Sequence, residues 1–147
     1  MIERAGLPLV KSFEGLCLSP YICSGGIATI GYGSTWYFGK YRVNLGDPSI
    51  TKNEAELLLK FGYDIRERWV LNNVMVPLTA NQLGALTSWV YNIGRTNAGS
   101  STLIRVLNRG DYHAASCEFW KWRRAAGRIL AGLVRRRESE RVLFNTP

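Results

Sequence analysis

Three side chains near the start of the chain could together perform acid/base chemistry. Glu14 and Cys23 are separated by eight residues, and Cys23 and Thr29 by five. A carboxyl can donate a proton, a thiolate can act as base or nucleophile, and a hydroxyl can hold a water molecule. If the fold brings the three together, they form a candidate acid/base site.

A short helix is predicted to position the carboxyl. Glu14 is the only acidic residue in the apolar-patterned segment Leu7–Leu18, and Glu3 lies too early to share its place. Residues Gly6–Phe13 predict a short helix that leads into Glu14. Pro8 suits the first turn of that helix, where the missing N–H costs no hydrogen bond.

A hairpin is predicted to carry the thiol and the hydroxyl. Ser24–Gly26 is a Gly-rich turn, and Ile27–Ile30 alternates apolar and polar residues as a half-buried strand does. The hairpin, over residues 21–33, would hold Cys23 on one arm and Thr29 on the other. A carboxyl, a thiol and a hydroxyl would then converge on one cleft.

The sequence around these residues resembles that of a known family. The register Glu-x8-(Asp/Cys)-x5-Thr lies inside Glu-Gly-Leu…Tyr-x-Cys…Gly-x-x-Thr-Ile-Gly-Tyr-Gly, and it is similar to that of the bacteriophage-type lysozymes (endolysins, muramidases; glycoside hydrolase family 24). The resemblance covers nearly the whole chain. Further matching segments are Val76–Thr79 with Gln82, Asn92–Gly94, Ser101–Leu103, Leu107–Tyr112 and Gly132–Glu138.

The resemblance implies an activity and a role for each site residue. It implies hydrolysis of the β-1,4 bond between N-acetylmuramic acid and N-acetylglucosamine in bacterial peptidoglycan, which lyses the host cell. Glu14 would be the general acid, Cys23 the base or nucleophile, and Thr29 the residue that positions water. No cofactor and no metal are implied.

Cys23 departs from the commoner Asp of this family, although Cys is a known variant there. An unperturbed thiol with a pKa of ~8.5 is only a few per cent thiolate at neutral pH, so Cys23 would need a lowered pKa to act. Two alternatives therefore stay open. One is a lytic transglycosylase that uses Glu14 alone, and the other is a cell-wall-binding protein without catalysis.

Composition and charge limit the possible partners. The 147 residues are 46% hydrophobic and 20% charged, which fits one folded domain, and the net charge is +8. Eight basic residues against two acidic ones lie between Lys121 and Arg141. No nucleic-acid-reading motif accompanies them, so attraction to an anionic cell wall is the better interpretation.

The cysteines and the N-terminus bear on where the chain is made. Cys17, Cys23 and Cys117 lack metal-ligand spacing and are typical of a reducing compartment. Cys17 and Cys23 would join in a disulfide only if the fold brought them close; otherwise Cys17 is buried on the helix face. No basic stretch followed by an apolar core opens the chain, so we expect no signal peptide and no stable membrane insertion.

The remaining elements are predicted from caps, periodicity and turn residues. Residues 36–43 read as a third strand or an aromatic-lined loop. The capping box Thr51–Glu54 begins a long helix that runs to about Asn72. Its predicted apolar face is Leu57, Leu58, Phe61, Ile65, Trp69 and Val70.

Shorter helices are expected in the second half of the chain. Thr79 and Gln82 cap a core helix that ends at Gly94, and a polar loop follows from Arg95 to Ser100. The next predicted elements are a helix over Ser101–Asn108, a helix capped by Asp111, a loop over Gly127–Gly132 and a last helix through Val134–Leu143.

The order of these elements predicts an α+β fold. The resemblance implies a single, mainly helical, lysozyme-like domain with a small antiparallel sheet lobe (13–50), a connecting helix (51–72) and a helical lobe (73–147), with the cleft between the lobes. The resemblance further implies a monomer made in the host cytoplasm that acts on periplasmic peptidoglycan. A separate membrane-permeabilising phage protein would release it.

Overall fold

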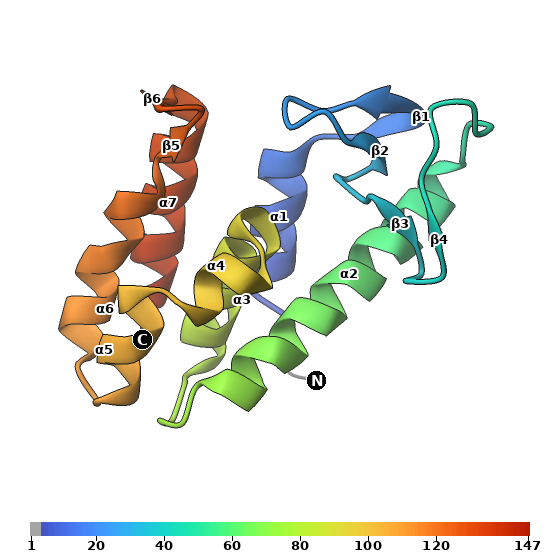
Figure 1. Ribbon diagram of the computed structural model, residues 1–147. Coiled ribbons are helices and arrows are strands. Elements are labelled where there is room, and N and C mark those ends of the chain that lie inside the picture. The colour runs from blue at the N-terminus through green and yellow to red at the C-terminus, as the bar shows by residue number, and fades with distance from the viewer. Residues whose placement is uncertain (1–3) are drawn as a thin grey trace. The chain divides into compact units, whose positions relative to one another are not determined.

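The computed structural model describes residues 4–147, so Glu3 lies outside the described residues. The chain divides into two compact units. Figure 1 shows the elements of both, coloured by residue number from the N-terminus to the C-terminus. We call residues 11–64 the hairpin unit, and residues up to Val10 together with Ile65–Pro147 the helical unit. The fold is α+β and mainly helical with small antiparallel sheets, which confirms the predicted fold class.

The hairpin unit contains the predicted hairpin. Its elements are the end of α1 (Gly6–Glu14), β1 (Cys17–Ile22), β2 (Ala28–Gly31), β3 (Trp36–Tyr37), β4 (Tyr41–Arg42) and the first part of α2 (Lys52–Asn73). Strands β1 and β2 are antiparallel, and Tyr21 pairs with Thr29. The register shifts between Cys17 and Tyr21, so the two strands are not regular along their whole length.

Strands β3 and β4 form a hairpin of their own and do not extend the β1–β2 sheet. Their connection places Phe38 at φ 53° and Gly39 at φ 71°. A positive φ strains Phe38, and the edge-on packing of its ring against Phe61, at 5.5 Å between centroids, offsets that strain. The predicted aromatic segment is therefore a hairpin that leaves Trp36 and Tyr41 exposed.

Helix α2 begins and ends within one residue of its prediction. The Glu54 backbone N–H donates to Thr51 Oγ1 at 3.1 Å, as a capping box requires. The predicted apolar face is wrong in part, because Leu57 is 57% exposed. The buried face of the helix instead includes Leu59 and Tyr63.

The helical unit surrounds one central helix, as predicted. Its further elements are α3 (Ala80–Ile93), α4 (Arg95–Gly99), α5 (Thr102–Asn108), α6 (Tyr112–Glu118), η1 (Phe119–Trp122), β5 (Arg124–Ala125), β6 (Arg128–Ile129) and α7 (Ala131–Phe144). Every residue of α3 from Gly84 to Val90 is buried. Around Trp89 the rings of Phe119 and Trp122 pack edge-on, with centroids 6.1 and 5.8 Å away.

Two predicted loops are wrong. The polar segment Arg95–Ser100 contains helix α4, which follows α3 directly after Gly94. The predicted loop over Gly127–Gly132 holds strand β6 and the start of α7. Ala126 and Gly127, at φ 51° and 76°, make the two-residue turn of the β5–β6 hairpin, which suits a mirror-image turn.

A buried ion cluster in the helical unit corrects the predicted basic face. Arg137 Nε lies 2.7 Å from Glu140 Oε1, and Arg136 Nε lies 3.3 Å from Glu140 Oε2. Ser88 Oγ on α3 donates to the same carboxylate at 2.6 Å. Burial raises the pKa of Glu140, and the charges of Arg137 and Arg136 oppose that rise. Arg136 and Arg137 are therefore buried internal partners and do not belong to a wall-facing surface.

Candidate active site

Helix α1 ends at Glu14, as predicted, and holds this carboxyl against the end of β2. A Cβ built on Gly33 would lie 2.8 Å from Glu14 Oε2, so the carboxyl rests on glycine backbone. Gly33 has φ +86°, which side chains rarely adopt. Glycine is therefore favoured at position 33 for two reasons. The backbone has a positive φ there, and the Glu14 carboxyl occupies the space that a Cβ would take.

A second cluster holds the last turn of α1 in place. Lys11 Nζ forms an ion pair with Glu56 on α2, and Tyr32 Oη donates to Glu56 Oε1 at 3.2 Å. Lys11 also lies 5.6 Å above the Tyr32 ring. The hydrogen bond to Glu56 raises the pKa of Lys11, and Lys11 lowers the pKa of Glu56. These contacts connect the helix that carries Glu14 to the residue next to Gly33.

Cys23 follows β1 directly and lies at the base of the hairpin turn, not on a strand arm as predicted. Its backbone N–H donates to the Ile27 carbonyl at 3.0 Å, and its own carbonyl accepts from Gly26 N–H at 2.9 Å. Hydrogen bonds from the Ile27 backbone, the Thr29 hydroxyl and the Gly25 backbone hold the pKa of the Cys23 thiol below its ordinary value. Hydrogen bonds within the hairpin therefore lower the pKa of this thiol, and no arginine is among the causes.

Thr29 lies on β2 and its side chain is buried, with 3% of the residue exposed. Its hydroxyl donates to the Ile27 carbonyl at 2.9 Å and is also within hydrogen-bonding range of the Cys23 sulfur. A hydroxyl has one proton, so it can donate to the carbonyl or to a thiolate, but not to both at once. The structure therefore brings Cys23 and Thr29 together as predicted.

The sequence analysis missed Tyr21, which the structure adds to the site. Tyr21 is the cross-strand partner of Thr29, so their side chains share one face of the hairpin. Burial and the neighbouring charges of Cys17, Glu14 and Cys23 raise the pKa of Tyr21. The phenol is thus within electrostatic reach of both the predicted acid and the predicted base. Its one signal in the sequence is strand alternation, since Tyr21 lies two residues before Cys23.

The other thiols are free in the structure. Cys17 and Cys23 do not form a disulfide, and Cys17 Sγ donates to the Ser19 carbonyl at 3.2 Å. Cys117 lies 3.9 Å from His113 Nε2 on the exposed side of α6. Within residues 4–147, no group of three or more His, Cys, Asp or Glu side chains could hold a metal ion.

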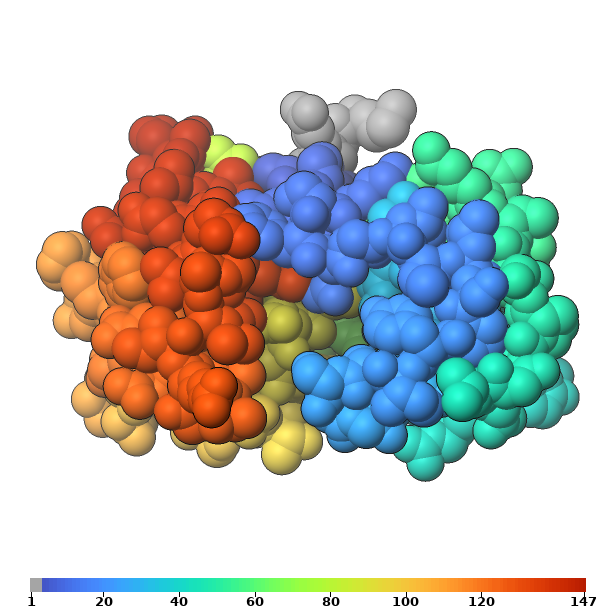
Figure 2. All heavy atoms as spheres, turned by 90° about the horizontal axis from the view of Figure 1, so that it is seen from above, coloured from blue at the N-terminus to red at the C-terminus, as the bar shows by residue number. Residues whose placement is uncertain are grey.

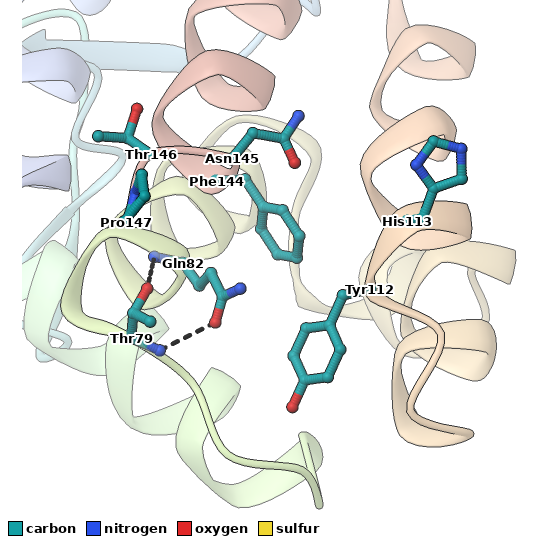
Figure 3. Close-up of a pocket in the computed structure, with 8 residues that line it drawn as sticks. All are labelled: Thr79, Gln82, Tyr112, His113, Phe144, Asn145, Thr146 and Pro147. Carbon is teal, nitrogen blue, oxygen red and sulfur yellow. Dashed lines mark hydrogen bonds between the residues drawn. The ribbon is translucent and has the colours of Figure 1, made fainter.

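A pocket in the helical unit contains none of the predicted site residues (Figure 3). Its walls come from the start of α3, the start of α6 and the end of the chain, and its polar groups include Thr79 and Gln82. Those two side chains already satisfy each other's backbone N–H groups, at 2.9 and 3.1 Å, as the capping box of α3. The pocket holds His113 but no carboxyl side chain, so it has no acid and base pair.

No helix within the described part of the chain is long and apolar enough to cross a bilayer.

Comparison with known proteins gives a consistent result over almost the whole chain. Residues 11–140 match the family described as Phage lysozyme. An endolysin of Acyrthosiphon pisum secondary endosymbiont phage 1 is 44% identical over 99% of this chain and 98% of its own length. An endolysin of Salmonella phage P22 is 38% identical over 97% of each chain.

A solved structure agrees with these sequence matches. The muramidase domain of SpmX from Asticaccaulis excentricus has a TM-score of 0.84 and 37% identity, and the match covers 100% of this chain and 99% of that one. The fold and the sequence identities agree. The chain belongs to the phage lysozyme family.

Proposed function

We propose that this protein is an endolysin whose Glu14, Cys23 and Thr29 hydrolyse the β-1,4 bond between N-acetylmuramic acid and N-acetylglucosamine in peptidoglycan. As a member of the phage lysozyme family it is a peptidoglycan-hydrolysing glycoside hydrolase. The observation that carries the residue assignment is the hydrogen-bonded turn that lowers the pKa of Cys23 next to Thr29.

Each step has a residue suited to it. Glycoside hydrolysis needs a proton for the leaving oxygen, and either a base that activates the attacking water or a nucleophile that attacks the anomeric carbon. Glu14, resting on Gly33 at the end of α1, donates the proton. The Cys23 thiolate, favoured by its hydrogen bonds to the turn, acts as base or nucleophile. The Thr29 hydroxyl, which sits beside that sulfur, orients the attacking water.

The proposal extends to where the protein works. We propose that it acts as a monomer on periplasmic peptidoglycan after synthesis in the host cytoplasm, and that a separate membrane-permeabilising phage protein releases it. The net charge of +8 supports attraction to an anionic wall. Arg124, Arg128 and Arg135 are among the exposed residues that supply this charge.

The test is the loss of turbidity of purified peptidoglycan. Wild type should clear the suspension, and Glu14→Gln and Cys23→Ser should each slow clearing by at least about 10²-fold, the lower end of acid/base contributions. Clearing by Cys23→Ser at the wild-type rate would remove Cys23 from the mechanism and favour a reaction that uses Glu14 alone. Absence of clearing by wild type would contradict the activity itself.

A further inference from the structure

A second pocket lies on the hairpin unit, beside the turn that holds Cys23. It has a volume of about 250 Å³, and its walls are residues 26–28, Thr35 and residues 42–44. In Figure 2 the mid-blue atoms of the β1–β2 hairpin lie against the teal atoms of the segment that follows β4. Neither Glu14, Cys23 nor Thr29 lines this pocket, so the reaction proposed above does not use it.

Arg42 gives the pocket a positive charge. Its guanidinium lies 5.5 Å from the centre of the exposed Trp36 ring, and the two residues are cross-strand partners in the β3–β4 hairpin. Within residues 4–147, no carboxylate lies at ion-pair distance from Arg42. A guanidinium that stacks on an indole keeps its N–H edge available, and that edge matches a carboxylate.

The rest of the pocket is small and mixed in character. Ile27, Ala28 and Val43 supply aliphatic surface, whereas Thr35 and Asn44 supply a hydroxyl and an amide. Such a wall fits a short peptide that carries methyl side chains and carboxylates. It fits a bare sugar chain less well, because a neutral sugar gives the uncompensated arginine no anion to bind.

We propose that this pocket binds the peptide stem of peptidoglycan through a carboxylate held by Arg42. The inference rests on the proposed function, because it takes peptidoglycan as the substrate. The peptide stem of peptidoglycan carries alanine methyl groups, which match the aliphatic wall of the pocket. It also carries free carboxylates, which match the Arg42 guanidinium. Arg42 is the anion-binding residue, and Trp36 holds its guanidinium in place.

The position of the pocket lets one substrate reach both sites. Ile27 lines the pocket, and its carbonyl accepts hydrogen bonds from Cys23 N–H and from the Thr29 hydroxyl. Ala28 and Thr29 are neighbours on β2, so their side chains lie on opposite faces of the strand. An extended peptide of five residues spans roughly 17 Å, whereas paired strands lie about 5 Å apart, so a stem can pass around the turn.

The experiment compares two substrates and four proteins. The substrates are intact peptidoglycan and the same glycan strands after an amidase has removed the peptides and the lactyl carboxylates that this step frees have been converted to methylamides. The proteins are wild type, Arg42→Gln, Arg42→Lys and the matched charge control Lys60→Gln, whose residue is exposed on α2 of the same unit and does not line the pocket. Circular dichroism checks that each variant is folded.

Arg42→Gln should raise KM for intact peptidoglycan roughly tenfold and leave kcat unchanged, as expected for one lost charge-assisted interaction. It should leave KM for peptide-free strands unchanged. Arg42→Lys should fall between, because it keeps the charge and loses the planar fork. Lys60→Gln should match wild type on both substrates.

Three outcomes would overturn the assignment, and they are distinguishable from one another. An equal rise in KM on both substrates would assign Arg42 to the glycan. Equal effects of Arg42→Gln and Lys60→Gln on intact wall would reduce Arg42 to general surface charge. Failure of wild type to cleave either substrate would overturn the proposed function together with this site.

Discussion

At the scale of single residues, the thiol at position 23 is the least usual part of the site. Hydrogen bonds from the Ile27 backbone, the Thr29 hydroxyl and the Gly25 backbone lower the pKa of this thiol. We propose that the Cys23 thiolate takes the place of the aspartate that is commoner in this family. Replacing Cys23 by aspartate should then preserve activity.

Cys23→Asp should keep activity within about tenfold of wild type, because a carboxylate is ionised at neutral pH without help from the turn. Cys23→Ser should lose at least about 10²-fold, since a hydroxyl is a poor base. The measurement is the initial rate of peptidoglycan hydrolysis at pH 7. Cys17→Ser is the control and should stay near wild type. An aspartate no better than serine would show that position 23 carries no base.

Thr29→Val should raise the pKa of the Cys23 thiol, because the variant removes the hydroxyl that hydrogen-bonds the sulfur. The thiolate would then form only at higher pH, so Cys23 should be alkylated only at higher pH. Activity should stay low at every pH, because the variant also removes the hydroxyl that is proposed to orient the attacking water. The check is the pH dependence of Cys23 alkylation by iodoacetamide in a Cys17→Ser, Cys117→Ser background. An alkylation profile identical to that of the parent would contradict the role of Thr29.

At the scale of elements, the site depends on how α1 meets the end of β2. Gly33 lets the Glu14 carboxyl approach the backbone, and the Lys11–Glu56–Tyr32 cluster holds the last turn of α1. A residue with a Cβ at position 33 would push the carboxyl away from its place. The geometry of the helix end therefore sets the position of the Glu14 carboxyl.

Gly33→Ala should lower kcat by roughly 10²-fold, because a misplacement of about 1 Å can cost that much. Gly110→Ala is a matched control: Gly110 has φ +84°, close to the +86° of Gly33, and no atom lies within 4 Å of its built Cβ. Both variants should lose similar stability, about 1 kcal/mol, from the strained φ. Equal activity of the two variants would show that the contact with Glu14 does not matter.

Local sequence signals predicted most elements because their causes are local. The capping boxes Thr51–Glu54 and Thr79–Gln82 satisfy backbone N–H groups within one turn, and both helices begin where these pairs predict. The buried face of α2 was predicted in part only, because Leu57 and Leu59 are equally apolar and tertiary contacts choose between them. The β5–β6 hairpin was missed because Ala126 is unusual in a left-handed turn.

In the candidate site, too, local sequence signals predicted some residues, whereas others depend on tertiary contacts. Spacing and resemblance predicted Glu14, Cys23 and Thr29, since all three lie within sixteen consecutive residues of the sequence. Tyr21 and the Lys11–Glu56 pair could not be predicted in this way, because their roles depend on strand pairing and on a helix some 40 residues later. The pocket at Arg42 likewise needs two hairpins to be built before it exists.

At the scale of the whole molecule, the basic residues behind the net charge of +8 are of two kinds, buried and exposed. Arg136 and Arg137 are buried inside the helical unit, where both form ion pairs with Glu140 on α7. The Glu140 carboxylate also accepts a hydrogen bond from Ser88 on α3. Arg124, Arg128 and Arg135 are among the basic residues that stay exposed. Charge counted from the sequence therefore overstates the basic surface of the C-terminal segment.

Glu140→Gln should destabilise the protein by about 3–5 kcal/mol, because two buried guanidinium groups lose the carboxylate that they share. For a chain of this size, Tm should fall on the order of 10 °C. Glu138→Gln is the control on the same helix, since Glu138 pairs with Arg141 at 3.7 Å on the surface and its loss should cost under about 1 kcal/mol. Thermal unfolding by circular dichroism measures both. Equal Tm values for the two variants would contradict a structural role for the buried cluster.

Glu14 is proposed to drive hydrolysis of the glycan of peptidoglycan, and the chemical ends of the products are the sharpest test of that role. Wild type should release fragments with reducing N-acetylmuramic acid ends, quantified after borohydride reduction and mass spectrometry. Glu14→Gln should keep the wild-type Tm within a few degrees and release at least about 10²-fold fewer such ends, since an amide of the same shape cannot donate the proton. Anhydro ends from wild type would contradict hydrolysis, and a tenth of wild-type activity in Glu14→Gln would contradict the role of Glu14 as the acid.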